Sequence, residues 1–235
     1  MNIYRPIIGK VIETSSLEKE IEKYKNEMTT IENKLFAKEE NLEINAEDIE
    51  FEKCVFKDCR ISGNLSKSIF HDVKFENCDF SNCVLSECSF IRVETNNSKF
   101  VGSNFTDSRI YHFSSKETSF KYTNFSNTNI EEMIFNECDL SNSSFYQSKI
   151  KHIYFEKSQL IQTDFFKVNL KGIDFSTSDI SGIITSIEEL KGAIVNNFQA
   201  IELSKLLGII IKWLYNKKEP WRNGEVNWVG KKKEN

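Results

Sequence analysis

The chain has 235 residues, 39% of them hydrophobic, and its 31 Lys and Arg stand against 35 Asp and Glu, for a net charge of -4. So small a net charge gives no reason to infer a nucleic-acid partner. No apolar run has the length of a membrane helix, and the first six residues lack the apolar core of a signal peptide. The sequence therefore predicts a cytoplasmic protein of one or two domains with no membrane contact.

Residues 1–45 are predicted to hold a lead-in segment followed by an amphipathic helix. Ser15 or Ser16 can cap this helix. Two arrangements stay open, because isolated helices of this length are marginally stable: the helix packs on the rest of the chain, or two copies form a coiled coil. Its apolar residues follow at alternating steps of four and three, the spacing of a heptad seam: Leu17, Ile21, Tyr24, Met28, Ile31 and Leu35.

Between Leu65 and Ile180 every fifth residue is apolar, with Thr95 and Ser115 as the two exceptions. Of these 24 positions, 22 are apolar and 13 are Phe. Neither a helix, which repeats its buried face every 3.6 residues, nor a strand, which repeats every 2, produces this period. A backbone that turns a corner every five residues does produce it. Such a coil buries each apolar centre and the small residue two positions before it.

The two exceptions are separated by four repeats of this period and therefore lie on the same wall of adjacent coils. Val93 and Phe113 are larger than usual at the neighbouring inward positions and can refill the lost volume. Two interpretations stay open for this wall: a compensated core, or a local bulge that contacts a partner.

The period extends upstream to about Ala46, but the frame loses one residue between Ile61 and Leu65. With this slip, Cys59 and Cys78 stack in adjacent coils at about 4.8 Å, within disulfide reach, although a reducing cytosol favours free thiols. All six cysteines occupy inward positions, so we expect buried thiols: Cys54, Cys59, Cys78, Cys83, Cys88 and Cys138.

Several runs of the sequence resemble the pentapeptide-repeat family. Its pattern is a small residue, Asp or Asn, Leu or Phe, a small polar residue and any residue. Four segments match it: CDFSN at 78–82, SNFTD at 103–107, TNFSN at 123–127 and CDLSN at 138–142. In that family four pentapeptides form one square turn of a right-handed β-helix. The resemblance implies an all-β fold, a right-handed quadrilateral β-helix over residues 46–185 with a helical segment at each end.

Residues 186–212 are predicted to cap the open end of the β-helix, where unpaired backbone groups would otherwise be exposed. Ser186 to Glu189 fits a capping box, residues 197–207 are expected to form a short helix, and Gly208 ends it. The stretch 190–209 resembles the C-terminal cap of the quinolone-resistance (Qnr) subgroup, which joins two rods. The resemblance implies a homodimer formed through Phe198, Ile201, Leu206, Leu207, Ile209 and Ile211.

Residues 213–235 contain all three Trp and several Lys. We expect an extra cap with a solvated tail; contact with nucleic acid or with a membrane surface is the alternative.

No set of residues predicts catalysis. His71, His112 and His152 are expected on the surface, and the sequence contains no Cys-x-x-Cys motif or phosphate-binding loop. A regular rod also offers no pocket in which carboxylate pKa values could be tuned. We therefore expect a protein that is not an enzyme and that uses no cofactor or metal.

Two hypotheses for the function remain, and the first is DNA mimicry. The resemblance to the quinolone-resistance subgroup implies that an acidic dimeric rod occupies the DNA-binding saddle of DNA gyrase or topoisomerase IV and modulates quinolone sensitivity. The five-residue frame lacks the loop insertions that help some members of the subgroup to protect the enzyme from drug. The candidate phosphate-like residues are Asp139, Asp164, Asp174, Asp179, Glu131, Glu132 and Glu137.

The second hypothesis is a protein-interaction scaffold. Tyr146 is expected above Phe166, and Ile134 above Tyr154, because the members of each pair are separated by one full coil. Exposed aromatic pairs mark partner surfaces. The N-terminal helix would provide a further contact surface.

Overall fold

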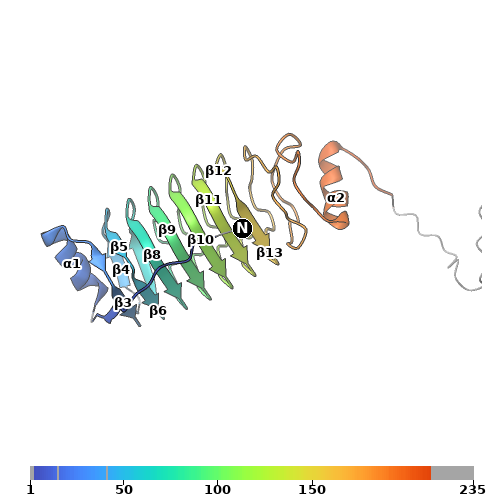
Figure 1. Cartoon of the computed structure of the whole chain (residues 1–235). Helices are drawn as coiled ribbons and strands as arrows, with labels where there is room; N and C mark the ends of the chain where they lie inside the picture. Colours follow the sequence, from blue (N-terminus) through green and yellow to red (C-terminus); the bar gives the residue numbers. More distant parts are fainter. Residues whose placement is uncertain (1–2, 15, 41, 213–235) are drawn as a thin grey trace, which may run out of the picture.

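The structure, a computed structural model, describes residues 3–14, 16–40 and 42–212. It is a rod of stacked coils with α1 (Leu17–Glu27) at one end and α2 (Asn197–Leu203) at the other (Figure 1). The predicted Trp-containing tail, residues 213–235, lies outside the described residues. Among those that are described, no helix is both long and apolar enough to cross a membrane.

The strands of the rod pair in parallel, each with the equivalent strand one coil away. Eleven strands form one sheet, and β4 and β7 form a second. This arrangement confirms the predicted right-handed quadrilateral β-helix. The strands are β1 (Ile12–Glu13), β2 (Ile31–Glu32), β3 (Lys34–Ala37), β4 (Leu42–Asn45), β5 (Glu50–Glu52), β6 (Val55–Lys57), β7 (Ile61–Asn64), β8 (Ile69–Glu76), β9 (Ser89–Asn96), β10 (Arg109–Lys116), β11 (Asn129–Asn136), β12 (Lys149–Ile150) and β13 (Ile153–Glu156).

Stacked phenylalanines explain why the sequence repeats every five residues. In register with its neighbours, each inward ring lies on the ring one coil away: Phe70 and Phe90 stack with centroids 5.0 Å apart, and Phe145 and Phe165 do so at the same distance. The corner residues between walls, such as Asn127, have positive φ, which Asn and Asp tolerate better than other non-glycine residues. Aromatic stacking adds to the free energy of burying the rings.

The predicted one-residue slip lies in the wall between Arg60 and Asn64. Arg60 pairs with Asp79, whereas Asn64 pairs with Val84, so the first pair is closer along the chain by one residue. Gly63 closes the shortened wall with a φ of 104°. The sequence located this slip correctly because the inward frame changes there.

The predicted heptad helix is wrong in its C-terminal half. Helix α1 has 11 residues and ends at Glu27. Met28, which follows it, takes the left-handed conformation, and Ile31 and Leu35 lie in β2 and β3. The first coil therefore begins at residue 31 rather than near residue 46. Ile31, Phe36 and Ala46 continue the five-residue frame upstream, but Ile31 also fits the heptad spacing.

Helix α1 packs on the rod as a single helix, which is one of the two predicted arrangements. Leu17 and Ile21 are buried in the same core as the first coil. The hydroxyl of Tyr24 donates a hydrogen bond to the Asp48 carbonyl at 2.9 Å. Because its apolar face is already covered, α1 presents no seam for a coiled coil.

At the other end, the coils continue beyond residue 185, where we expected them to stop. The amide of Ile184 donates to the Thr163 carbonyl at 2.9 Å, and that of Ile194 donates to the Ile173 carbonyl at 2.8 Å. The expected capping box at residues 186–189 is present in part, since the Ser186 amide donates to Glu189 Oε2 at 2.7 Å, but it opens a turn rather than a helix.

The predicted short C-terminal helix is confirmed. Helix α2 begins after Asn196, which forms a capping box with Gln199, and a 3-10 turn over Ser204–Leu207 leads to Gly208 at a φ of 72°. Gln199 is buried, and its Nε2 donates to the carbonyls of Phe175 at 2.8 Å and Ser178 at 2.7 Å. This one side chain therefore pairs backbone acceptors that the last coil leaves open.

The wall with two polar centres is a compensated core rather than a bulge. Thr95 and Ser115 pair in register between β9 and β10, both are buried, and the Thr95 hydroxyl donates to the Ser115 hydroxyl at 2.8 Å. Phe113 is buried beside them, with its ring 6.0 Å from that of Phe90.

Candidate binding surfaces

One wall of the rod carries almost no charge. We call it the low-charge face, and its residues stack coil on coil through isolated bridges that link positions 84, 104, 124, 144 and 164. Among the ten outward residues that we assign to it, Asp164 is the only one that is charged, while Glu87, Asp107 and Lys167 lie at its edge. The outward residues of this face are Val84, Ser86, Asn104, Thr106, Asn124, Ser126, Ser144, Tyr146, Asp164 and Phe166.

The low-charge face ends in the predicted aromatic pair. The rings of Tyr146 and Phe166 stack with centroids 6.3 Å apart, and Phe166 is 41% exposed. Lys167 donates from Nζ to the Tyr146 hydroxyl at 3.0 Å and lies 5.2 Å from the centre of its ring. The geometry of the pair is confirmed, and its role in binding stays a prediction.

The second predicted pair, Ile134 and Tyr154, also lies in register, between β11 and β13. Tyr154 is exposed and Ile134 is half-buried. This pair is on a different wall from Tyr146 and Phe166, and its neighbours on that wall include the charged side chains of Lys116 and Glu156.

Four of the seven acidic candidates form ion pairs with side chains of adjacent coils. Burial opposes the ionisation of Asp139, but hydrogen bonds from Ser141 and the Lys121 ammonium outweigh it and lower the pKa of Asp139. A lysine or histidine of the next coil lies beside each of the other three. The four pairs are Asp139 with Lys121, Glu131 with Lys151, Glu132 with His152 and Glu137 with Lys157.

The other three acidic candidates, Asp164, Asp174 and Asp179, have no cationic partner among the described residues but point from three different walls. Each accepts a hydrogen bond from the backbone amide two residues on, at 2.8 to 2.9 Å. Hydrogen bonds from Ser176 lower the pKa of Asp174. The structure therefore does not gather the seven carboxylates into one continuous acidic surface.

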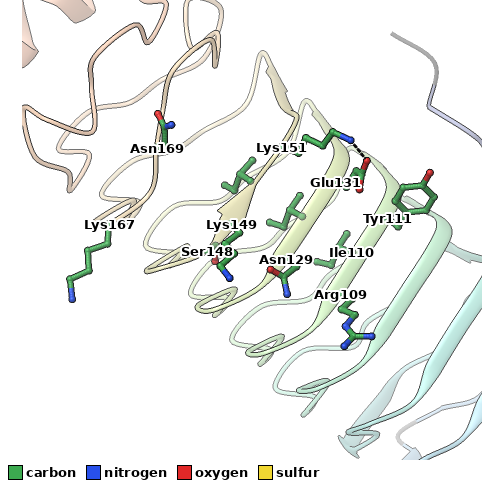
Figure 2. Close-up of a pocket in the computed structure, with 12 residues that line it drawn as sticks. Arg109, Ile110, Tyr111, Asn129, Glu131, Ser148, Lys149, Lys151, Lys167 and Asn169 are labelled. Atoms are coloured by element: carbon green, nitrogen blue, oxygen red, sulfur yellow. Dashed lines mark hydrogen bonds and ion pairs between the residues drawn. The ribbon is translucent and has the colours of Figure 1, made fainter.

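A shallow basic groove of about 690 Å³ lies on the wall that begins with Arg109. Arg109, Asn129, Lys149 and Asn169 follow one another at the same position of successive coils (Figure 2). Lys151 also lines the groove but pairs with Glu131. Sequence reasoning missed this surface, although the one-coil spacing of Arg109, Asn129 and Lys149 would have indicated it.

The residues of the predicted dimer interface gather at the C-terminal end of the rod. Phe198 is 81% exposed, Leu206, Leu207, Ile209 and Ile211 are exposed, and Ile201 is half-buried. Together with Ile210 they give this end an apolar surface. Dimerisation through it stays a prediction.

All six cysteines are buried free thiols, as expected. Burial raises the pKa of Cys54, Cys83, Cys88 and Cys138 to about 12. Cys59 differs, because a hydrogen bond from the adjacent Cys78 thiol lowers the pKa of Cys59 to about 7. Within the described part of the chain, no group of three or more His, Cys, Asp or Glu is placed to hold a metal ion.

Comparisons with known proteins agree with the repeat pattern. A family model described as pentapeptide repeats (8 copies) matches residues 68–107, and one described as a pentapeptide repeat region matches residues 88–165 and 116–184. No curated protein matches the chain significantly.

Solved structures similar to the chain include a trypsin-treated variant of QnrB1, described as a plasmid-mediated fluoroquinolone resistance protein. It is 20% identical, with a TM-score of 0.49, over 79% of this chain and 92% of its own. HetL, a pentapeptide repeat protein from Nostoc sp. strain PCC 7120, is 10% identical over 75% of this chain and 96% of its own, with a TM-score of 0.27.

Proposed function

The chain belongs to the pentapeptide-repeat family, and from this premise we propose that it is a non-enzymatic binding protein whose low-charge face docks on a protein partner. The observation that carries this proposal is the exposed stack of Tyr146 and Phe166 at the end of a wall with a single charged residue among its ten outward residues. The buried centres of protein interfaces are depleted in charge and enriched in Tyr and Phe.

The regularity of the face supports the same proposal. Its outward residues are small and half-buried from Val84 to Ser144, so they form a flat surface of amide and hydroxyl groups. A flat surface of this kind loses little side-chain entropy when it is covered. The aromatic pair then supplies the area that anchors the partner.

The first candidate partner is a type II topoisomerase, DNA gyrase or topoisomerase IV. Two features favour it: the resemblance of residues 190–209 to the quinolone-resistance cap, and the exposed apolar residues around Phe198 that would join two rods into a longer homodimer. With this partner, the rod would occupy the DNA-binding saddle of the enzyme and modulate quinolone sensitivity. The carboxylates of Asp164, Asp174 and Asp179, which have no cationic partner in the described part of the chain, would then meet basic groups of the enzyme.

A gyrase supercoiling assay tests the topoisomerase proposal. We expect the full chain to inhibit supercoiling at micromolar concentration, and to alter the response to a fluoroquinolone. Inhibition by mimicry should weaken as salt is raised, since screening reduces electrostatic competition. No effect of the protein on supercoiling at either salt concentration would remove gyrase as the partner.

Two double variants separate the modes of binding. Replacing Tyr146 and Phe166 with Ser should abolish binding through the low-charge face, and replacing Ile134 and Tyr154 with Ser is the matched control on another wall. Replacing Asp174 and Asp179 with Lys should abolish binding by mimicry. The proposed role of the low-charge face would be overturned if binding to gyrase, or to any other purified partner, survives the Tyr146 and Phe166 replacement but is lost when the aspartates are replaced.

A further inference from the structure

The N-terminal arm, residues 3–11, folds back along the outside of the rod. Figure 1 shows this dark-blue segment running from the α1 end across the strands toward β10. It follows one corner of the coils, which we call the corner column. The residues of this column occupy the same position in successive coils, given by the register of β8 to β13: Asp72, Arg92, His112, Glu132 and His152.

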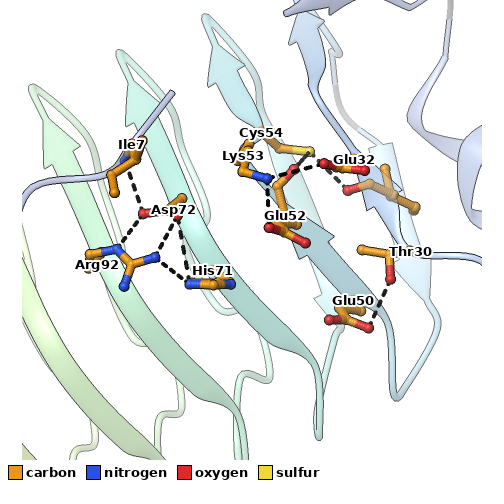
Figure 3. A network of polar contacts seen from close by, with 11 residues as sticks. Ile7, Thr30, Glu32, Glu50, Glu52, Lys53, Cys54, His71, Asp72 and Arg92 are labelled. Carbon is orange, nitrogen blue, oxygen red and sulfur yellow. Dashed lines mark hydrogen bonds and ion pairs between the residues drawn. The ribbon is translucent and has the colours of Figure 1, made fainter. Parts of the chain in front are cut away.

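The first contact of the arm is with a buried ion pair. The amide of Ile7 donates to Asp72 Oδ1 at 2.9 Å, and the guanidinium of Arg92 donates to both oxygens of the same carboxylate, at 2.6 and 2.7 Å (Figure 3). Burial opposes the ionisation of Asp72, but Arg92 and the Ile7 amide outweigh it and lower the pKa of Asp72. The carboxylate therefore stays charged throughout the neutral and mildly acidic range, so a loss of docking in that range does not come from protonation of Asp72.

The second contact of the arm is with a buried histidine. Tyr4 packs on His112 with ring centroids 4.7 Å apart and planes 86° to each other. His112 is only 4% exposed, and among the described residues neither ring nitrogen has a hydrogen-bond partner. The expected surface position of His112 is wrong, because the arm covers the corner.

Charged groups surround His112 on the neighbouring coils. Arg92 lies one coil before it, and Glu132 and Glu131 lie one coil after it. Tyr111, on the same strand, has its ring 4.1 Å from that of His112. The Glu132 carboxylate is engaged by His152, whose Nδ1 lies 2.7 Å from Glu132 Oε1.

Arg92 and the two glutamates act in opposite directions on His112. Burial is the largest influence and lowers the pKa of His112, against the attraction of Glu132 and Glu131, while Arg92 adds to the lowering. Neutral imidazole is therefore the form that fits beneath the arm. An imidazolium at this position would be deprived of water on the side that Tyr4 covers.

We propose that His112 is a proton-controlled latch: the neutral ring holds the N-terminal arm on the corner column, and protonation of the ring releases it. Tyr4 and Ile7 are themselves exposed, so the arm is held by few contacts and a modest change at one of them alters its position. Release would uncover His112, whose ring lies against Tyr111, a residue that lines the basic groove. The latch does not depend on the function proposed above.

The direction of the pH dependence follows from linkage. With the arm released, His112 meets water and its pKa returns toward the ordinary value of about 6.5. Because the pKa is lower with the arm docked, docking is unaffected above about pH 6.5 and weakens as the pH falls below it, by up to about tenfold per pH unit until the lowered pKa is reached.

The test is nuclear magnetic resonance of the full chain between pH 5 and 8. The Ile7 amide reports on the docked arm, and the imidazole signals of His71, His112 and His152 report on each titration. We expect His112 to titrate below the ordinary histidine value of about 6.5, and the Ile7 amide to leave its docked chemical shift with the midpoint of His112. An Ile7 signal that does not change over this range, or that follows His71 instead, would overturn the proposal.

Two substitutions sharpen the test. His112→Phe keeps an aromatic ring beneath Tyr4 without a titratable group, so the arm should stay docked at pH 5; His71→Gln and His152→Gln are the controls and should keep the pH dependence. Tyr4→Ala should raise the pKa of His112 toward its ordinary value, and this measurement does not depend on how well the first variant folds. A His112 pKa that stays the same in Tyr4→Ala contradicts the latch.

Discussion

Gly63 lies so close to Ile44 that a Cβ atom on Gly63 would be 2.1 Å from the Ile44 carbonyl oxygen. This contact occurs where the coil is one residue short, and the φ of Gly63, 104°, is one that other residues rarely adopt. The slip in the repeat is therefore tolerated only because glycine is present at this position. The backbone of the adjacent coil leaves no room for a side chain.

The first prediction follows from this contact. Gly63→Ala should lower the free energy of unfolding by about 3 kcal/mol or more, because it adds a clash with backbone to a strained φ. Gly172→Ala is the control, since Gly172 also has positive φ but nothing lies within 4 Å of the Cβ position; it should cost only about 1 kcal/mol. Urea denaturation measures both, and equal losses would contradict the steric account.

The second prediction concerns the phenylalanine stack. Phe145→Ala should destabilise the rod by about 3–5 kcal/mol, because Phe145 is fully buried and stacks with Phe125 and Phe165. Phe166→Ala, at the exposed neighbouring ring, should change stability by less than about 1 kcal/mol. Thermal unfolding of the two variants compares them directly. A large loss for Phe166→Ala would mean that this ring serves the fold rather than a partner.

The third prediction tests how the last coil is closed. Gln199→Glu removes the two hydrogen bonds from Nε2 and sets a carboxylate against the carbonyls of Phe175 and Ser178. We expect a loss of about 1–3 kcal/mol, with faster hydrogen exchange confined to residues 173–203. Exchange that accelerates equally along the whole rod would show that the C-terminal coil does not open by itself.

The fourth prediction concerns thiol reactivity. Cys59, whose pKa is lowered to about 7 by the Cys78 thiol, should be alkylated before the four thiols whose pKa burial raises to about 12. Its rate should rise between pH 6 and 8 as the thiolate forms. Peptide mass spectrometry after a timed exposure of the folded protein to iodoacetamide identifies the site. Labelling of Cys83 or Cys138 ahead of Cys59 would contradict this order.

The fifth prediction is a pH dependence of stability. The pKa of Asp72 is lower in the folded chain than its unfolded value of about 3.9. Its stabilising contribution is therefore complete above about pH 4 and is lost as the pH falls through the lowered pKa. Asp72→Asn should cost about 2 kcal/mol at neutral pH, with a difference from the natural chain that shrinks below pH 4. A difference that stays constant from pH 7 to 3 would show that the charge of Asp72 is not what matters.

Sequence reasoning succeeded where contacts repeat at a fixed separation. Each coil touches only its neighbours, so residues one coil apart must meet, and the stack of Tyr146 on Phe166 follows from their numbers alone. The predicted start of the coils is wrong because Ile31 fits both the heptad spacing and the five-residue period. Only the structure, in which β2 pairs with β5, decided between them.

Charge pairing and the acidic surface needed the tertiary structure. The lysine and histidine partners of Glu131, Glu132 and Glu137 lie one coil further along the chain. Which side chains bend toward each other depends on their rotamers rather than on the repeat. The seven carboxylates were also chosen without regard to the wall each occupies. The structure distributes them around the rod, which shifts the proposed contact to the low-charge face.

The sequence by itself determined the β-helix, the position of its slip, the buried cysteines and the short C-terminal helix, because each is encoded in a local pattern or in the five-residue period. Only the tertiary structure decided the path of the N-terminal arm. The arm has no period, and Ile7 meets Asp72 across 65 residues of chain. The burial of His112 follows from the path of the arm, so the five-residue repeat does not predict that burial.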